Sequence, residues 1–214
     1  MMNKFKKLGI IFLIVLLSIF LLAACGQGTK DITVDEDNNQ QEEENNAAKP
    51  AEEEKEEPKL GSRSNPVPFQ STATVDDELY NDEGESFKIK FDLTVTEVIR
   101  GEEAYQMLVS MNQFNEPAPE GYEWVLANTK VKFVESETED LSFNIDGVMN
   151  FDMVSESGDI YSGDVYASVE PDFTFEMYVG NEKQGYIAGL VKTGENAQLR
   201  YEELLGGHVF FNLQ

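Results

Sequence analysis

The chain has 214 residues, with 41 acidic and 16 basic side chains and a formal net charge of −25. A protein this acidic is repelled by nucleic-acid phosphates, so we expect no DNA or RNA partner. With one cysteine and one histidine, the chain has too few ligands for a zinc site and cannot form an intramolecular disulfide. We therefore expect no zinc site and no cofactor, whereas calcium, which takes oxygen ligands, is considered with the acidic loops below.

Residues 1–24 have the zones of a secretory signal peptide. Three lysines give a positive start, residues 8–20 are almost wholly apolar, and small residues follow at positions 23 and 24. This order of charge, apolar run and small residues is typical of an export signal that is removed from the mature protein. The sequence therefore predicts export from the cytoplasm.

The apolar run ends in Leu22, Ala23, Ala24 and Cys25, and Cys25 is the single cysteine of the chain. This tetrapeptide resembles the lipobox of bacterial lipoproteins. The resemblance implies transfer of diacylglycerol to the Cys25 thiol and cleavage before it, which anchors the chain in the outer face of the cell membrane. An uncleaved span stays open as an alternative, because residues 8–24 are at the short limit of what crosses a bilayer.

Residues 25–60 follow as the lipidated cysteine and an acidic linker. The segment 26–60 has 12 acidic and 4 basic side chains and no aromatic residue. Such a segment cannot bury enough apolar surface to offset its chain entropy, so it is expected to be disordered. We interpret it as a tether that lifts a domain off the lipid. An acidic tail for cations or basic partners is the alternative.

Residues 61–214 have the size of one domain and carry 29 acidic and 9 basic side chains. The clearest pattern is Phe87–Thr96, where apolar and polar residues alternate as in a half-buried strand. A polar turn region, Asp76–Glu85, precedes it. The other predicted strand segments are Phe69–Val75, Trp124–Val134, Leu141–Ser155, Ile160–Tyr166, Phe173–Val179, Tyr186–Val191, Ala197–Tyr201 and His208–Leu213.

One helix is predicted, over residues 102–112. Ala104, Met107, Leu108 and Met111 have the spacing of one helix face. Many strands, frequent turns and a single short helix indicate an all-β protein, an antiparallel β-sandwich.

Four stretches of this domain resemble the DUF4352 family of exported, often lipid-anchored bacterial proteins. They are Gly61–Pro66, Val95–Ala104, Pro117–Glu123 and Gly180–Gly185. The resemblance implies an immunoglobulin-like sandwich and an extracytoplasmic location typical of Gram-positive bacteria. It implies no activity and no catalytic residues.

The sequence offers little sign of catalysis. His208 is the only histidine, and no Gly-x-Ser-x-Gly nucleophile elbow is present. Carboxylates gather near one predicted hairpin, at Asp152, Glu156, Asp159 and Asp164, but without the spacing of a calcium-binding loop. We expect no catalytic residue and no metal site.

The first hypothesis for function is a non-catalytic binding module for an unknown envelope protein or ligand. Its expected contact surface is Met107, Met111, Phe114 and Trp124. The second hypothesis is a wall-polymer hydrolase that uses paired carboxylates as acid and base. The third is a purely structural envelope protein.

Overall fold

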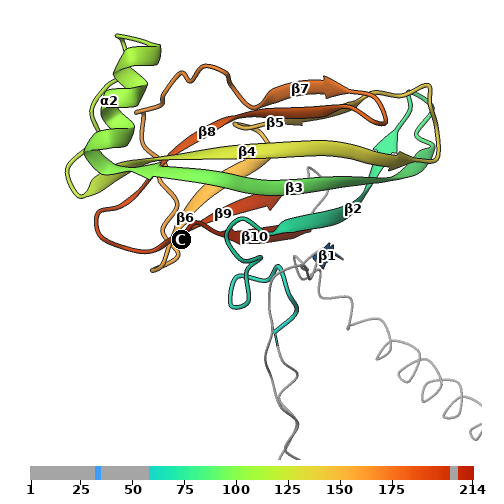
Figure 1. Ribbon diagram of the computed structural model, residues 1–214, viewed down its shortest axis with the longest axis horizontal. Coiled ribbons are helices and arrows are strands. Elements are labelled where there is room, and N and C mark those ends of the chain that lie inside the picture. Colours follow the sequence, from blue (N-terminus) through green and yellow to red (C-terminus); the bar gives the residue numbers. More distant parts are fainter. Residues whose placement is uncertain (1–31, 35–57, 203–206) are drawn as a thin grey trace, which may run out of the picture.

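The computed structural model describes residues 32–34, 58–202 and 207–214 (Figure 1). The lipobox, Cys25 and most of the predicted linker lie outside these residues. The described elements are β1 (Ile32–Val34), β2 (Thr72–Tyr80), β3 (Ser86–Arg100), α2 (Gly101–Met111), β4 (Tyr122–Ser136), β5 (Phe143–Asp146), β6 (Phe151–Ser155), β7 (Thr174–Met177), β8 (Glu182–Lys192), β9 (Ala197–Glu202) and β10 (His208–Asn212).

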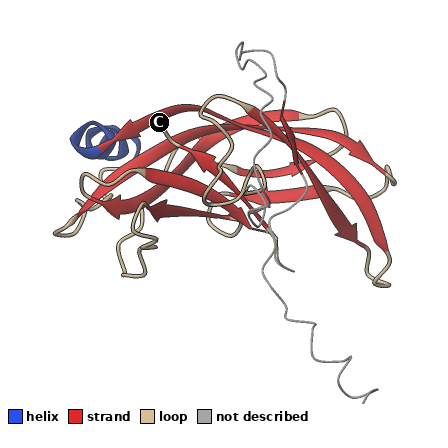
Figure 2. Cartoon of the chain, turned by 90° about the horizontal axis from the view of Figure 1, so that it is seen from below, coloured by secondary structure: helices blue, strands red, loops and turns tan. Residues whose placement is uncertain are grey.

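In the part of the chain that the structure describes, the strands form an antiparallel β-sandwich with one short helix, as predicted. One sheet has the order β1-β2-β3-β4-β8 and the other has the order β10-β9-β6. A two-stranded sheet, β5-β7, completes the fold. Figure 2 shows α2 at one end of the sandwich. In the described residues no helix is long and apolar enough to cross a membrane.

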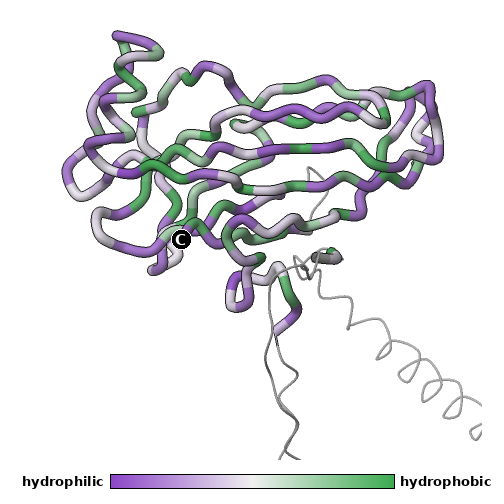
Figure 3. The backbone as a smooth tube through the Cα atoms, in the orientation of Figure 1, coloured by the Kyte–Doolittle hydropathy of each residue, from purple (hydrophilic) through white to green (hydrophobic). Residues whose placement is uncertain are grey.

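The main core lies between the sheets, and strand alternation fills it from both sides. In β3 the side chains of Ile89, Phe91, Leu93 and Val95 are buried. Those of Lys88, Lys90 and Asp92, which alternate with them, are more exposed. Figure 3 shows this alternation as changing hydropathy along the long strands. The predicted strand Phe87–Thr96 is thus confirmed, with its inward face in the core.

A second, smaller apolar cluster covers the outer face of β4. Trp124 and Leu126 point away from the main core and pack with Ala104 and Leu108 of α2. The helix therefore has the position of a cover over one end of the sheet. Its observed bounds, Gly101–Met111, agree with the prediction to within one residue.

The predicted strand Ile160–Tyr166 is wrong. This stretch is part of a long connection between β6 and β7 and has no strand assignment. Its alternation is nevertheless real: Tyr161 and Val165 are half-buried and pack against the cluster around Trp124. The segment packs its apolar side chains against the sheet but does not pair with it as a further strand.

The turn region before β3 is shorter than predicted, because β2 continues to Tyr80 and the polar residues 76–80 belong to it. Asp77 points inward from this strand and accepts a hydrogen bond from the Tyr201 hydroxyl at 2.8 Å. A buried charge that is satisfied in this way is compatible with a strand interior.

A strand also occurs within the segment that was expected to be a disordered linker. Ile32, Thr33 and Val34 form β1, which pairs with β2. Composition averaged over 35 residues obscured this run of three β-branched residues, a residue type that favours strands.

Candidate functional site

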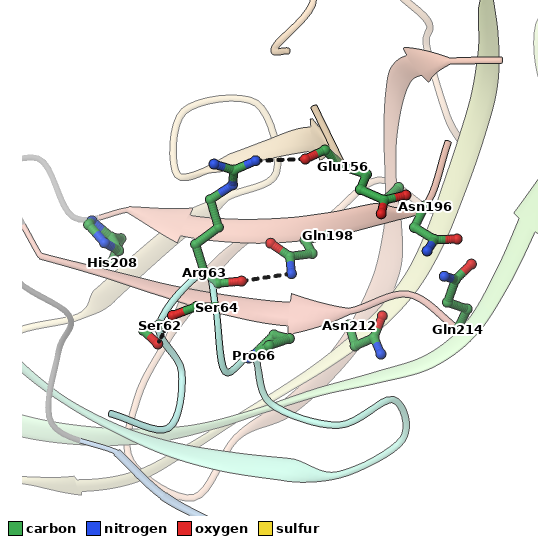
Figure 4. A pocket seen from close by; sticks show the side chains of 11 residues that line it. Ser62, Arg63, Ser64, Pro66, Glu156, Asn196, Gln198, His208, Asn212 and Gln214 are labelled. Carbon is green, nitrogen blue, oxygen red and sulfur yellow. Dashed lines mark hydrogen bonds between the residues drawn. The ribbon is translucent and has the colours of Figure 1, made fainter. Parts of the chain in front are cut away.

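A polar cleft of about 570 Å³ lies on the outer face of the β10-β9-β6 sheet (Figure 4). The chain segment that precedes β2 forms one wall, and β9 and β10 form the base. The lining residues are Ser62, Arg63, Ser64, Pro66, Glu156, Asn196, Ala197, Gln198, His208, Asn212 and Gln214.

Strand register brings the amides of the base together. In β9 and β10 the residues Ala197, Leu199, Val209 and Phe211 are buried in the core. Their neighbours at alternate positions therefore face outward. Gln198 and Asn212 are direct partners across the two strands. Side chains opposite each other on one face of an antiparallel pair lie about 5 Å apart at Cβ, so these two amides share the cleft.

Backbone hydrogen bonds hold the wall against β10. The Phe210 amide donates to the carbonyl oxygen of Gly61, and the Val67 amide donates to the carbonyl oxygen of Phe210, both at 2.8 Å. Residues 61–67 therefore run beside β10 as a fixed edge. Gly61 has φ +84°, a conformation that favours glycine.

Arg63 crosses the cleft and ties its parts together. Its Nη2 donates to the carbonyl oxygen of Glu156 at 2.8 Å, and its own carbonyl oxygen accepts a bond from Gln198 Nε2 at 3.0 Å (Figure 4). The wall, the residue that follows β6 and the start of β9 are thus connected by two side chains. These hydrogen bonds hold the walls of the cleft in place, although the Arg63 side chain is itself exposed.

The lining is rich in uncharged polar groups. Within the described part of the chain, the side chains of Asn196, Asn212 and Gln214 bond to no other protein group, and all three line the cleft. Arg63 and Glu156 are the only charged side chains in the lining, with opposite signs. In a chain of net charge −25, this is a locally neutral surface.

His208 lies at one side of the cleft (Figure 4). Its ring stacks edge-on against Phe210, with ring centroids 5.2 Å apart. Burial lowers the pKa of His208 below its usual value. The positive charge of Arg200 lowers it further, and the negative charge of Glu202 opposes that effect. The imidazole is therefore neutral at pH 7 and can both donate and accept a hydrogen bond.

The carboxylates that cluster in sequence are separated in the structure. Asp152 pairs with Arg200 at 2.6 Å, and Asp159 pairs with Lys192 at 3.6 Å and accepts from the Tyr122 hydroxyl at 2.9 Å. Among residues 32–34, 58–202 and 207–214, no three His, Cys, Asp or Glu residues are placed to hold a metal ion.

The predicted contact surface is wrong for Trp124. Its side chain is 2% exposed, and its Nε1 donates to the carbonyl oxygen of Glu116 at 3.0 Å. Both faces of β4 are covered, so a tryptophan on its outer face is core and not surface. Met107 and Met111 are half-buried, and Phe114 is 80% exposed.

The amides of the cleft were not singled out from the sequence. Polar residues at alternate positions of the last two strands read as an ordinary solvent face. The available signal was the recurrence of Asn and Gln at Asn196, Gln198, Asn212 and Gln214 near the end of the chain.

No family model and no curated protein matches the sequence, so membership of the DUF4352 family and an immunoglobulin-like topology stay predictions. A crystal structure of a candidate lipoprotein (ycdA) from Bacillus subtilis is similar at 15% identity with a TM-score of 0.38. The match covers 63% of this chain and 37% of that one, so the chain spans little more than a third of that structure. Neither the fold nor the function proposed below rests on this likeness.

Proposed function

We propose that this chain is an exported lipoprotein, anchored through Cys25 in the outer face of the cell membrane, and that its sandwich binds a saccharide of the envelope in the polar cleft. The anchor is supported by the sequence Leu22-Ala23-Ala24-Cys25 behind an apolar run. The binding role is supported by the chemistry of the cleft.

The observation that carries the binding role is the set of open amides at Asn196, Asn212 and Gln214. Each amide side chain offers two donors and an acceptor oxygen, so it can both give and take hydrogen bonds. Sugar hydroxyl and acetamido groups do the same. Since the lining has one cation and one anion, an uncharged saccharide fits the cleft better than a strongly charged ligand.

Binding without hydrolysis is favoured by the carboxylates of the cleft. Hydrolysis of a glycosidic bond by the usual route needs two carboxyl groups about 5 to 9.5 Å apart. Glu156 is the single carboxylate among the residues that line the cleft. A paired-carboxylate reaction therefore has no second partner in this lining.

The experiment is a calorimetric titration of the purified full chain in detergent with chitotetraose, an uncharged oligosaccharide rich in acetamido groups. Asn212→Leu removes an amide at nearly constant volume. We expect it to weaken binding about five- to tenfold, the effect of one hydrogen bond of about 1–1.4 kcal/mol.

The matched control is Asn144→Leu, at an exposed asparagine of β5 outside the cleft lining. It is expected to bind as the unmodified chain does. If Asn212→Leu and the unmodified chain bound chitotetraose with equal affinity, the cleft would not be the saccharide site. No binding by the unmodified chain at millimolar chitotetraose would reject the proposed ligand class.

A further inference from the structure

The strand β1 lies between the predicted lipid anchor and the domain. Ile32, its first residue, is seven positions after Cys25, whereas the main described segment begins only at Pro58. β1 pairs antiparallel with β2, with Ile32 opposite Val75 and Val34 opposite Ala73. The segment between the anchor and the domain therefore contacts the domain at residues 32–34, more than 20 residues before the main described segment begins.

Ile32 fixes β1 to both sheets. It packs against the main core. A Cβ atom at Gly61 would lie 2.6 Å from Ile32 Cδ1 and 3.2 Å from Val209 Cγ1. Gly61 thus leaves the space that this side chain occupies, beside β10 of the opposite sheet. Figure 1 shows β1 next to β2, on the side of the sandwich where β10 also lies.

The position of β1 shortens the chain available to the anchor. Seven residues between Cys25 and Ile32 reach at most about 25 Å when fully extended. If β1 were released, the 33 residues from Cys25 to Pro58 could extend to about 110–120 Å. Pairing of three residues therefore sets how far the domain can stand from the lipid.

We propose that β1 acts as a strap that holds the β2 edge of the sandwich within about 25 Å of the lipid-bearing residue. Its release lengthens the tether and leaves the edge of β2 without its paired strand. The limit on the distance between domain and membrane rests on the proposed anchor at Cys25. The pairing of β1 with β2 does not depend on that anchor.

Hydrogen–deuterium exchange of the full chain in detergent tests the pairing. Thr33→Pro removes a backbone donor from the middle of β1 and its ring is incompatible with a paired strand interior. We expect the amides within residues 72–76 that point toward β1, which alternate with those bonded to β3, to exchange at least about tenfold faster in this variant. Ala47→Pro, in the same stretch before the domain, is the control and is expected to leave them unchanged.

Exchange in β4 separates release of the strap from unfolding, since that strand is central in its sheet. If β4 also exchanges faster in Thr33→Pro, the milder Ile32→Ser is used, which removes the packing at Gly61 and keeps the backbone. Unchanged exchange at 72–76 in a folded Thr33→Pro or Ile32→Ser chain would overturn the strap.

Energy transfer on vesicles tests the reach. A dye on Gln113→Cys, at an exposed residue just after α2, is paired with an acceptor in the lipid surface. We expect transfer to fall in Thr33→Pro relative to the Ala47→Pro control. Equal transfer in the two variants would contradict a height set by β1. Cys25→Ser is expected to leave the vesicles yet keep slow exchange at 72–76, so failure of the anchor and failure of the strap are read separately.

Discussion

Replacing Trp124 with alanine is expected to lower the free energy of unfolding by about 3–5 kcal/mol. The side chain is among the largest that are fully buried, and it packs with Ala104, Leu108 and Leu190 on the outer face of the sheet. The substitution leaves a cavity under α2 and leaves the carbonyl oxygen of Glu116 without its indole donor. Urea denaturation followed by circular dichroism measures the effect.

Phe114→Ala is the matched control, because this ring is 80% exposed. It is expected to change the free energy of unfolding by no more than about 0.5 kcal/mol. If Trp124→Ala were as stable as Phe114→Ala and instead lost a binding partner, Trp124 would be a contact residue as the sequence had suggested, and the second cluster would not hold α2.

Replacing Tyr201 with phenylalanine is expected to cost about 1.5–3 kcal/mol, the range for a hydrogen bond to a charged group. The hydroxyl donates to Asp77 Oδ2 at 2.8 Å, and Asp77 is 8% exposed. The ring is kept, so its edge-on contact with Phe91 at 5.5 Å remains. The loss therefore reports the hydroxyl alone.

Tyr166→Phe provides the comparison, since Tyr166 is an exposed tyrosine in the connection before β7. Thermal unfolding at pH 7 is expected to show little change for this variant and a clear drop for Tyr201→Phe. A Tyr201→Phe chain as stable as the original would mean that Asp77 is satisfied without this bond.

The regular elements of this fold could be predicted because their residues carry local periodicity. The alternation in Phe87–Thr96 and the helical spacing of Ala104, Met107 and Leu108 each report one buried face. The residues 160–166 have a strand-like alternation too, but they bury one face against Trp124 and have no strand assignment. Periodicity reports which side chains are covered and does not report which backbone groups are paired.

The cleft and the strap could not be predicted for a related reason. The cleft joins Arg63, Gln198 and Asn212, which come together through the register of β9 with β10 and through the path of the segment before β2. β1 is three residues long, and its stability comes from Ile32 in the space beside Gly61. Both depend on contacts between distant residues.

The anchor at Cys25 is the premise of the proposed location and of the reach of the strap. Mass spectrometry of the N-terminal peptide, from chain extracted from the membranes of a bacterium that expresses it, tests that premise directly. The account predicts a peptide that begins at Cys25 and carries a diacylglyceryl group on its thiol, and a Cys25→Ser chain that is neither lipidated nor cleaved at that position. A membrane-bound chain with an unmodified Cys25 thiol and residues 1–24 still attached would contradict the account.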